Sequence, residues 1–181
     1  VLDEAGRFVI PLLSGHEGGA NDWAWQVAEA IGAEPVITTA NPYLKPVYTV
    51  GMGCERGCPK GDLMSILSFS LEQAGLTLDQ VHSISSIDIK ADEVGLLELA
   101  QDLGKSYRTW TVPQLMQMKD KLSTHSDYVY NTVGVYGVAE SAALYAAKEA
   151  VGTAPALVLV KQKNAKATCA IARAYPNLKR A

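Results

Sequence analysis

The hydrophobic positions at the start of the chain follow first a strand pattern and then a helix pattern. The apolar run Arg7–Leu13 is rich in β-forming residues and ends at a Ser-Gly pair, which is typical of a strand followed by a turn. Apolar residues then recur at helical spacing over 22–31, with Asn21 or Asp22 as the expected N-cap. Pro35–Thr39 favours a second strand, and the order strand, helix, strand predicts a parallel crossover unit.

A second strand–turn–helix pattern begins after a proline-bearing break without periodicity. We therefore predict a partial N-terminal unit over 1–40, a linker over 41–46 and a carboxy-terminal unit over 47–181. In the second unit the patterns predict helices at 60–74, 94–103, 112–118 and 139–150, and strands at 47–53, 81–89, 107–110, 157–160 and 167–172. The last two strands are expected to form a hairpin. The predicted fold is α/β, with two units that are each a mostly parallel sheet covered by helices.

Composition and charge exclude several classes of function. The chain has 181 residues, of which 48% are hydrophobic and 19% charged, as is ordinary for a globular protein. Its formal net charge is −3 and its basic residues are scattered, so we expect neither nucleic-acid nor membrane binding. No apolar run is long enough for a membrane span. The first residues have neither the basic segment nor the cleavage site of a signal peptide, so we expect none. Three cysteines cannot all pair, which favours a reducing, cytoplasmic location.

The first candidate site is the loop between the first predicted strand and helix, Leu12–Asn21. Its glycines and the amides of the following helix start are suited to bind an anion. Its histidine, His16, and its carboxylate, Glu17, are able to transfer protons near neutral pH. A tight turn in which the glycines serve only geometry is the alternative. Neither the P-loop pattern nor the dinucleotide-binding glycine pattern is present, so a nucleotide site is not expected.

The second candidate is another glycine turn after a strand, Gly51–Cys58. Arg56 there is able to hold a carboxylate through two parallel hydrogen bonds. Two thiols, Cys54 and Cys58, do not by themselves make a zinc site, and we expect no metal to be bound by the protein. Cys169 is expected to be a buried small hydrophobic residue.

Charged residues near other predicted strand ends form a third, more dispersed set. Lys90 and Glu93 follow one strand, Lys161 lies near the end of another, and Glu140 lies at a helix start. Each also has a simpler explanation, since strand ends commonly carry solvated charges and a carboxylate favours the first turn of a helix. By chemistry alone, the chain has several loops suited to anions and no defined catalytic set.

Taken together, these loops resemble the cobalamin biosynthesis protein G family, the cobalt-precorrin-5A hydrolases. The resemblance is carried by six segments in the family's order: Arg7–Asn21, Pro35–Ala40, Val50–Gly57, Ile87–Leu96, Gly137–Leu144 and Lys161–Lys163. It covers nearly the whole chain. Such a family member is expected to open the ring-A δ-lactone of cobalt-precorrin-5A with water, releasing acetaldehyde and giving cobalt-precorrin-5B.

The resemblance also implies roles for particular residues. His16 and Glu17 are the expected catalytic residues. The expected substrate-binding residues are Ser14, Gly15, Gly18, Gly19, Asn21, Gly53, Cys54, Arg56, Gly57, Lys90, Glu93, Glu140 and Lys161. No resident cofactor is expected, since cobalt arrives within the corrinoid substrate, and other enzymes of the pathway are further candidate partners. The alternative function is a non-enzymatic corrinoid-binding or hand-over protein, because the carboxy-terminal domain also occurs alone.

Overall fold

The chain divides into two compact units. The computed structural model describes residues 1–12, 19–37 and 45–176. By their contacts these residues fall into one unit within Val1–Lys45 and another within Pro46–Asn177. Most of the segment predicted as a linker, residues 41–44, lies outside the described residues, as do Thr38 and Thr39 at the end of the second predicted strand.

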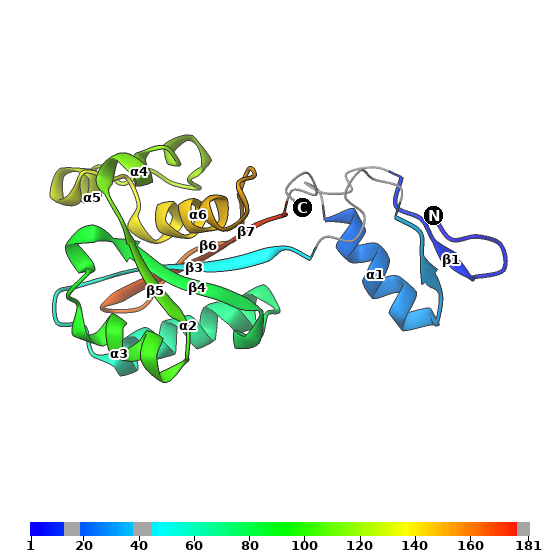
Figure 1. The fold of residues 1–181 in the computed structure, drawn as a ribbon, viewed down its shortest axis with the longest axis horizontal. Helices are drawn as coiled ribbons and strands as arrows, with labels where there is room; N and C mark the ends of the chain where they lie inside the picture. The colour runs from blue at the N-terminus through cyan, green and yellow to red at the C-terminus, as the bar shows by residue number, and fades with distance from the viewer. Residues whose placement is uncertain (13–18, 38–44, 177–181) are drawn as a thin grey trace. The chain divides into compact units, whose positions relative to one another are not determined.

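The first unit is a small crossover of one helix over a two-stranded parallel sheet (Figure 1). It contains β1 (Phe8–Val9), α1 (Ala20–Ile31) and β2 (Glu34–Pro35). The parallel pairing that the sequence predicted is confirmed. The predicted N-cap is wrong, because the helix begins two residues earlier than predicted and its N-cap is Gly19, which adopts a left-handed conformation (φ 72°).

The second unit is built on a five-stranded sheet. Its strands are β3 (Val47–Cys54), β4 (Val81–Ile87), β5 (Ser106–Trp110), β6 (Ala156–Lys163) and β7 (Ala167–Ala174). They lie in the order β5-β4-β3-β7-β6, with β3, β4 and β5 parallel and β7 antiparallel to both of its neighbours. Since β7 alone is reversed, the other four strands share one direction and end at the same edge of the sheet.

Helices cover both faces of this sheet (Figure 1). One face carries α2 (Lys60–Ala74) and α3 (Val94–Asp102), and the other carries α4 (Val112–Met116), α5 (Asp127–Val133) and α6 (Val138–Val151). Short 3-10 turns lie at Leu78–Gln80, Asp88–Lys90 and Lys119–Lys121. The predicted helices and strands of this unit are confirmed within a few residues, whereas α5 was not predicted.

Small residues bring α6 unusually close to the centre of the sheet. The buried face of α6 is mostly alanine, and the hydroxyl of Thr49 on β3 donates a 2.7 Å hydrogen bond to the Ala143 carbonyl. At Gly51, an added Cβ would lie 1.9 Å from the Ala139 carbonyl oxygen and 2.4 Å from the Ala143 nitrogen. The alanine-rich helix and the glycine of β3 are therefore complementary, and together they fix α6 against β3.

Candidate functional site

A pocket lies at the edge of the second unit where β3, β4 and β6 end. Open α/β sheets commonly bind ligands at this edge. The pocket has a volume of about 470 Å³, within the range of small-molecule sites. Its lining includes the strand ends Gly53, Cys54 and Ile87, the 3-10 turn with Ile89 and Lys90, the start of α6, and the β6–β7 hairpin from Lys161 to Thr168.

A buried ion pair lies in the loop after β4, and one of its members also binds the loop after β3. Lys90 donates a 2.9 Å hydrogen bond through Nζ to Oε2 of Glu93, and both side chains are almost fully buried. The other carboxylate oxygen of Glu93 accepts a 2.7 Å hydrogen bond from the Gly57 amide. Buried charges are tolerated when they are paired and hydrogen-bonded, as they are here.

Arg56 reinforces the same junction from its exposed side. Its Nη1 donates to Asp92 at 2.6 Å and its Nη2 to the Ile89 carbonyl at 2.7 Å, while Glu93 lies 3.5 Å from Nη1. The hydrogen bond from Arg56 holds the pKa of Asp92 below its ordinary value. The guanidinium therefore uses its two-pronged geometry within the protein, across the two loops.

The pKa of Glu93 lies below its ordinary value. Burial acts to raise it, but the hydrogen bonds from Lys90 and Gly57 and the charges of Lys90 and Arg56 outweigh that effect. Because the folded pKa is lowered, the ionised carboxylate stabilises the fold above the pKa of the unfolded chain. This contribution is lost as pH falls through the lower, folded pKa.

We expect Glu93→Gln to make stability less sensitive to acid. The free energy of unfolding of the wild-type protein should exceed that of the variant by a constant amount above about pH 5, and the difference should shrink as pH falls below the ordinary pKa of 4.5. Urea denaturation at a series of pH values measures this. Glu98→Gln, an exposed position on α3, is the matched control. A difference that stays constant down to pH 3 would contradict the assignment.

Glu140 is a second buried carboxylate, and it joins three segments of the unit. From the first turn of α6 it accepts hydrogen bonds from the Ser123 amide (2.8 Å), the Ser123 hydroxyl (2.6 Å) and the Lys161 amide of β6 (2.8 Å). It thereby ties the segment before α5 and the edge strand β6 to the helix start. Its oxygens are occupied by protein donors, so its geometry is that of a positioning residue.

Glu140→Gln should therefore destabilise the fold by about 1–3 kcal/mol, the cost of leaving a buried donor unpaired. Glutamine keeps the shape but turns an NH₂ group toward at least one N–H donor. Thermal and urea denaturation measure the loss. Glu149→Gln, exposed near the end of the same helix, should change stability little. Equal stabilities of the two variants would show that the three hydrogen bonds contribute nothing.

The structure distributes the predicted residues of the second unit over two adjoining pockets. Gly53, Cys54, Lys90 and Lys161 line the 470 Å³ pocket. Arg56, Gly57 and Glu93 instead line a neighbouring pocket of about 390 Å³ between the β3 loop and α3. These residues therefore do not share one pocket, and Arg56 contacts Asp92 and Glu93 in the smaller one.

The cysteines are held as thiols in the second unit. Burial raises the pKa of Cys54 to about 11, although the nearby charge of Lys90 acts in the opposite direction. Burial likewise raises the pKa of Cys58, and that of the fully buried Cys169 to about 12. A thiol with a raised pKa is a poor nucleophile at neutral pH, so Cys54 contributes a polarisable contact to the pocket. Cys169 is buried, as the sequence predicted.

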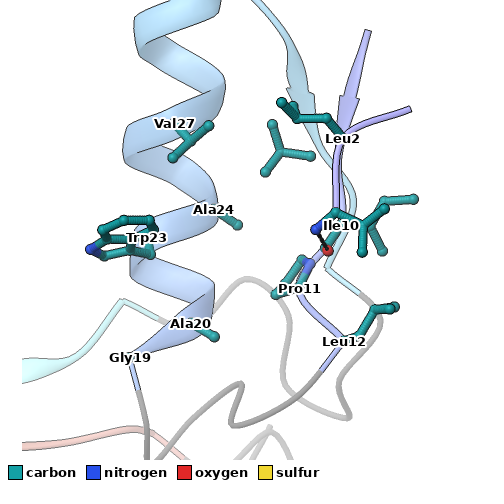
Figure 2. Close-up of a pocket in the computed structure, with 11 residues that line it drawn as sticks. Leu2, Ile10, Pro11, Leu12, Gly19, Ala20, Trp23, Ala24 and Val27 are labelled. Carbon is teal, nitrogen blue, oxygen red and sulfur yellow. Dashed lines mark hydrogen bonds between the residues drawn. The ribbon is translucent and has the colours of Figure 1, made fainter. Parts of the chain in front are cut away.

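The first unit has a separate apolar pocket of about 520 Å³ beside the start of α1 (Figure 2). Leu12 and Gly19, which flank the predicted catalytic loop in sequence, both line it, as do Ile10, Trp23 and Val27. The residues Ser14, Gly15, His16, Glu17 and Gly18 lie outside the described residues. Asn21 is buried in the first turn of α1. The described part of this pocket therefore offers apolar contacts and the amides of a helix start.

Several lining residues of the 470 Å³ pocket are not among the residues that the sequence singled out, and Tyr128 on α5 is one of them. Lys163, which lies within a segment that carries the family resemblance, also lines the pocket. Among the described residues, no group of three or more potential ligands is placed to hold a metal ion. None of the helices in the described ranges is long and apolar enough to cross a bilayer.

Two family models match the chain in succession. The model described as "Cobalamin synthesis G N-terminal" matches residues 1–41, and "Cobalamin synthesis G C-terminus" matches residues 48–172. The second match includes every described lining residue of the 470 Å³ pocket.

Individual relatives and a solved structure also point to cobalamin biosynthesis. The chain is 30% identical over 270 residues to a cobalt-precorrin-5A hydrolase from Priestia megaterium, covering 95% of this chain and 70% of that protein. It is 60% identical over 40 residues to a cobalt-precorrin-5A hydrolase from Salmonella typhimurium, which is 22% of this chain and 11% of that one. A solved structure of CobE, a protein from the cobalamin biosynthetic pathway, is similar with a TM-score of 0.69 and 30% identity, covering 73% of this chain and 94% of CobE.

Proposed function

Because the chain belongs to the cobalamin synthesis G family, we propose that it is a cobalt-precorrin-5A hydrolase. In this reaction water opens the ring-A δ-lactone of cobalt-precorrin-5A, acetaldehyde leaves, and cobalt-precorrin-5B remains. The cobalt ion is part of the substrate.

The observation that carries this proposal is the presence of both family segments in one chain, in order. A relative named as the hydrolase matches across both, and its alignment is longer than this chain, so that relative has further residues within the matched span. The glycine-rich loop with His16 and Glu17 falls within the N-terminal match. The proposal assigns catalysis to this loop and corrinoid binding to the second unit.

The chemistry of the two units is consistent with that division. Lactone hydrolysis requires a base that activates water and donors that stabilise the oxyanion. His16 or Glu17 is proposed as the base, and the glycine-turn amides as the donors. The corrinoid carries many peripheral carboxylates, for which the pocket of the second unit provides lysine side chains at its edge.

A second candidate function is a non-enzymatic corrinoid carrier. It is favoured by the likeness to CobE, which extends over most of this chain and nearly all of CobE. The hydrolase is preferred because the chain also has the N-terminal family segment, residues 1–41, in addition to the C-terminal segment, residues 48–172. The N-terminal segment contains His16 and Glu17, which are suited to catalysis.

Purified chain incubated with cobalt-precorrin-5A separates these functions. Acetaldehyde is measured by its reduction with alcohol dehydrogenase and NADH, and the corrinoid by mass spectrometry. A hydrolase releases acetaldehyde in many turnovers per chain. A carrier binds the corrinoid, shifts its absorption spectrum and returns it unchanged, and that result would refute the proposal.

A further inference from the structure

The 470 Å³ pocket of the second unit has two chemically different parts in its lining. An apolar wall comes from α5 and the turn after β4, and consists of Tyr128, Val129, Val133 and Ile89. A basic wall comes from the β6–β7 hairpin and contains Lys161 and Lys163. Val129 and Val133 also pack against a core cluster. Tyr128 and Ile89 are exposed, and among the described residues neither lysine has an ion-pair partner.

Two side chains of the apolar wall are presented to solvent. Tyr128 is 80% exposed and Ile89 is 49% exposed. The helix that carries Tyr128 is held in place, because Tyr130 stacks on Tyr136 with ring centroids 4.5 Å apart and Ser126 caps the helix by accepting from the Val129 amide. An exposed aromatic ring on a fixed helix, beside a pocket, is suited to stack on the flat face of a ligand.

The basic wall has charge that the protein leaves uncompensated. Two other lysines of the lining are paired within the fold, Lys90 with Glu93 and Lys166 with Asp62. Across the described ranges, no carboxylate lies within ion-pair distance of Lys161 or Lys163. Among the described lining residues, Glu55 alone carries a carboxylate. The pocket therefore favours an anion over a neutral ligand.

Backbone contacts fix the basic wall relative to the helix start of α6. The amide of Lys161 donates to the buried Glu140, and the hairpin turn is closed by Asn164, whose side chain accepts from the amides of Lys166 and Ala167. The two lysines lie on either side of Gln162 at the end of β6, and both line the same pocket. They can therefore bind two carboxylates of one ligand.

From these observations we infer that the pocket binds a planar macrocycle with peripheral carboxylates in one orientation. The ring face rests on Tyr128 and Ile89, and the carboxylates at one side of the ring pair with Lys161 and Lys163. This inference rests on the proposed function for the class of ligand, and it adds the residues that orient it. Because the pocket is of the size that fits a small molecule, a whole macrocycle extends beyond it and part of the ring stays exposed.

The test uses three probes and the whole chain. Dicyanocobyrinic acid has the corrin ring with free carboxylates, its heptamethyl ester has the same ring without charges, and benzenehexacarboxylic acid has the charges on a small ring. Dissociation constants are measured by fluorescence quenching or calorimetry for wild type, Tyr128→Ala, Lys161→Ala and Lys163→Ala. The controls are Phe69→Ala, an exposed aromatic on α2 at the opposite face of the sheet, and Lys119→Ala, an exposed lysine outside the pocket.

The expected result is a crossed pattern. Each lysine variant weakens binding of the free acid by roughly tenfold to a hundredfold, the range for a hydrogen bond to a charged group, and leaves the ester unaffected. Tyr128→Ala weakens the binding of both corrin probes by roughly threefold to tenfold. Binding of the free acid weakens with added salt, because the ion pairs are exposed enough to be screened. The small polycarboxylate binds weakly, and the two controls behave as wild type.

Two results would overturn the inference. One is equal weakening of acid and ester by the lysine variants, which would mean that the lysines act through folding. The other is unchanged affinity for both corrin probes in all three variants. These outcomes differ from failure of the proposed function. If the variants show the crossed pattern but wild type releases no acetaldehyde, the hydrolase proposal falls and the binding mode stands; if acetaldehyde is released normally by all three variants at low substrate concentration, the binding mode falls alone.

Discussion

Replacing His16 by alanine, or Glu17 by glutamine, is expected to lower kcat for acetaldehyde release by about 10²–10⁴-fold, the usual cost of a lost general base. Both residues lie in the glycine-rich loop of the N-terminal family match, and they are its histidine and its carboxylate, the groups there suited to act as a base. The dissociation constant for the corrinoid should change little, because binding is assigned to the second unit. Steady-state kinetics with cobalt-precorrin-5A, together with binding titrations, separate the two effects.

Matched controls for these variants exist elsewhere in the chain. His82→Ala removes an exposed histidine of β4, and Glu29→Gln removes an exposed carboxylate of α1. Both should keep near wild-type kcat. If His16→Ala and Glu17→Gln lose affinity and rate to the same extent, the loop holds substrate and the base lies elsewhere.

Gly51→Ala is expected to destabilise the second unit by about 3 kcal/mol or more, at the upper end of overpacking effects. The new methyl group would meet backbone atoms of Ala139 and Ala143, which cannot rotate away as a side chain would. Relief requires α6 to move off β3, and that movement also strains the 2.7 Å hydrogen bond from Thr49 to the Ala143 carbonyl. Urea denaturation followed by circular dichroism measures the loss.

Gly61→Ala is the matched control. It lies in the first turn of α2, where an added Cβ meets nothing within 4 Å, and alanine is the better helix former. Its stability should equal or exceed that of wild type. If Gly51→Ala is too unstable to purify, its loss from the soluble fraction, together with a normal yield of soluble Gly61→Ala, also shows that the added methyl group destabilises the fold. A Gly51→Ala protein as stable as wild type would contradict the close packing.

Most elements of the second unit could be predicted because their signals are local. Glycine at 75 follows the last apolar position of a helical pattern, and it does end α2 in the left-handed conformation (φ 64°). Helix α5 escaped prediction because it has only seven residues, and its single core-facing pair, Val129 and Val133, is too short a pattern to indicate a helix. The N-cap of α1 was misplaced because Asn21 and Asp22 are favourable caps, while the turn geometry selected Gly19.

The site was harder to predict than the fold, since it depends on contacts between distant segments. Lys90 and Glu93 at a strand end have the same sequence signature whether they are solvated or paired, and only the folded chain shows that they form a buried pair against Gly57. Arg56 has the chemistry to bind a ligand carboxylate, yet Asp92 and the Ile89 carbonyl are nearer partners. Lys161 and Lys163 enter the pocket because β6 runs in the same direction as β3, which requires the reversed strand β7 between them.

Hydrolysis of the corrinoid in oxygen-18-labelled water tests the central claim most directly. If the chain opens the lactone with water at its acyl carbon, the corrinoid product must carry one labelled oxygen in the new carboxylate, formed together with acetaldehyde. Mass spectrometry of the corrinoid detects that single label. Recovery of unlabelled cobalt-precorrin-5A at full yield, from protein that binds it, would contradict the account and leave the chain as a carrier.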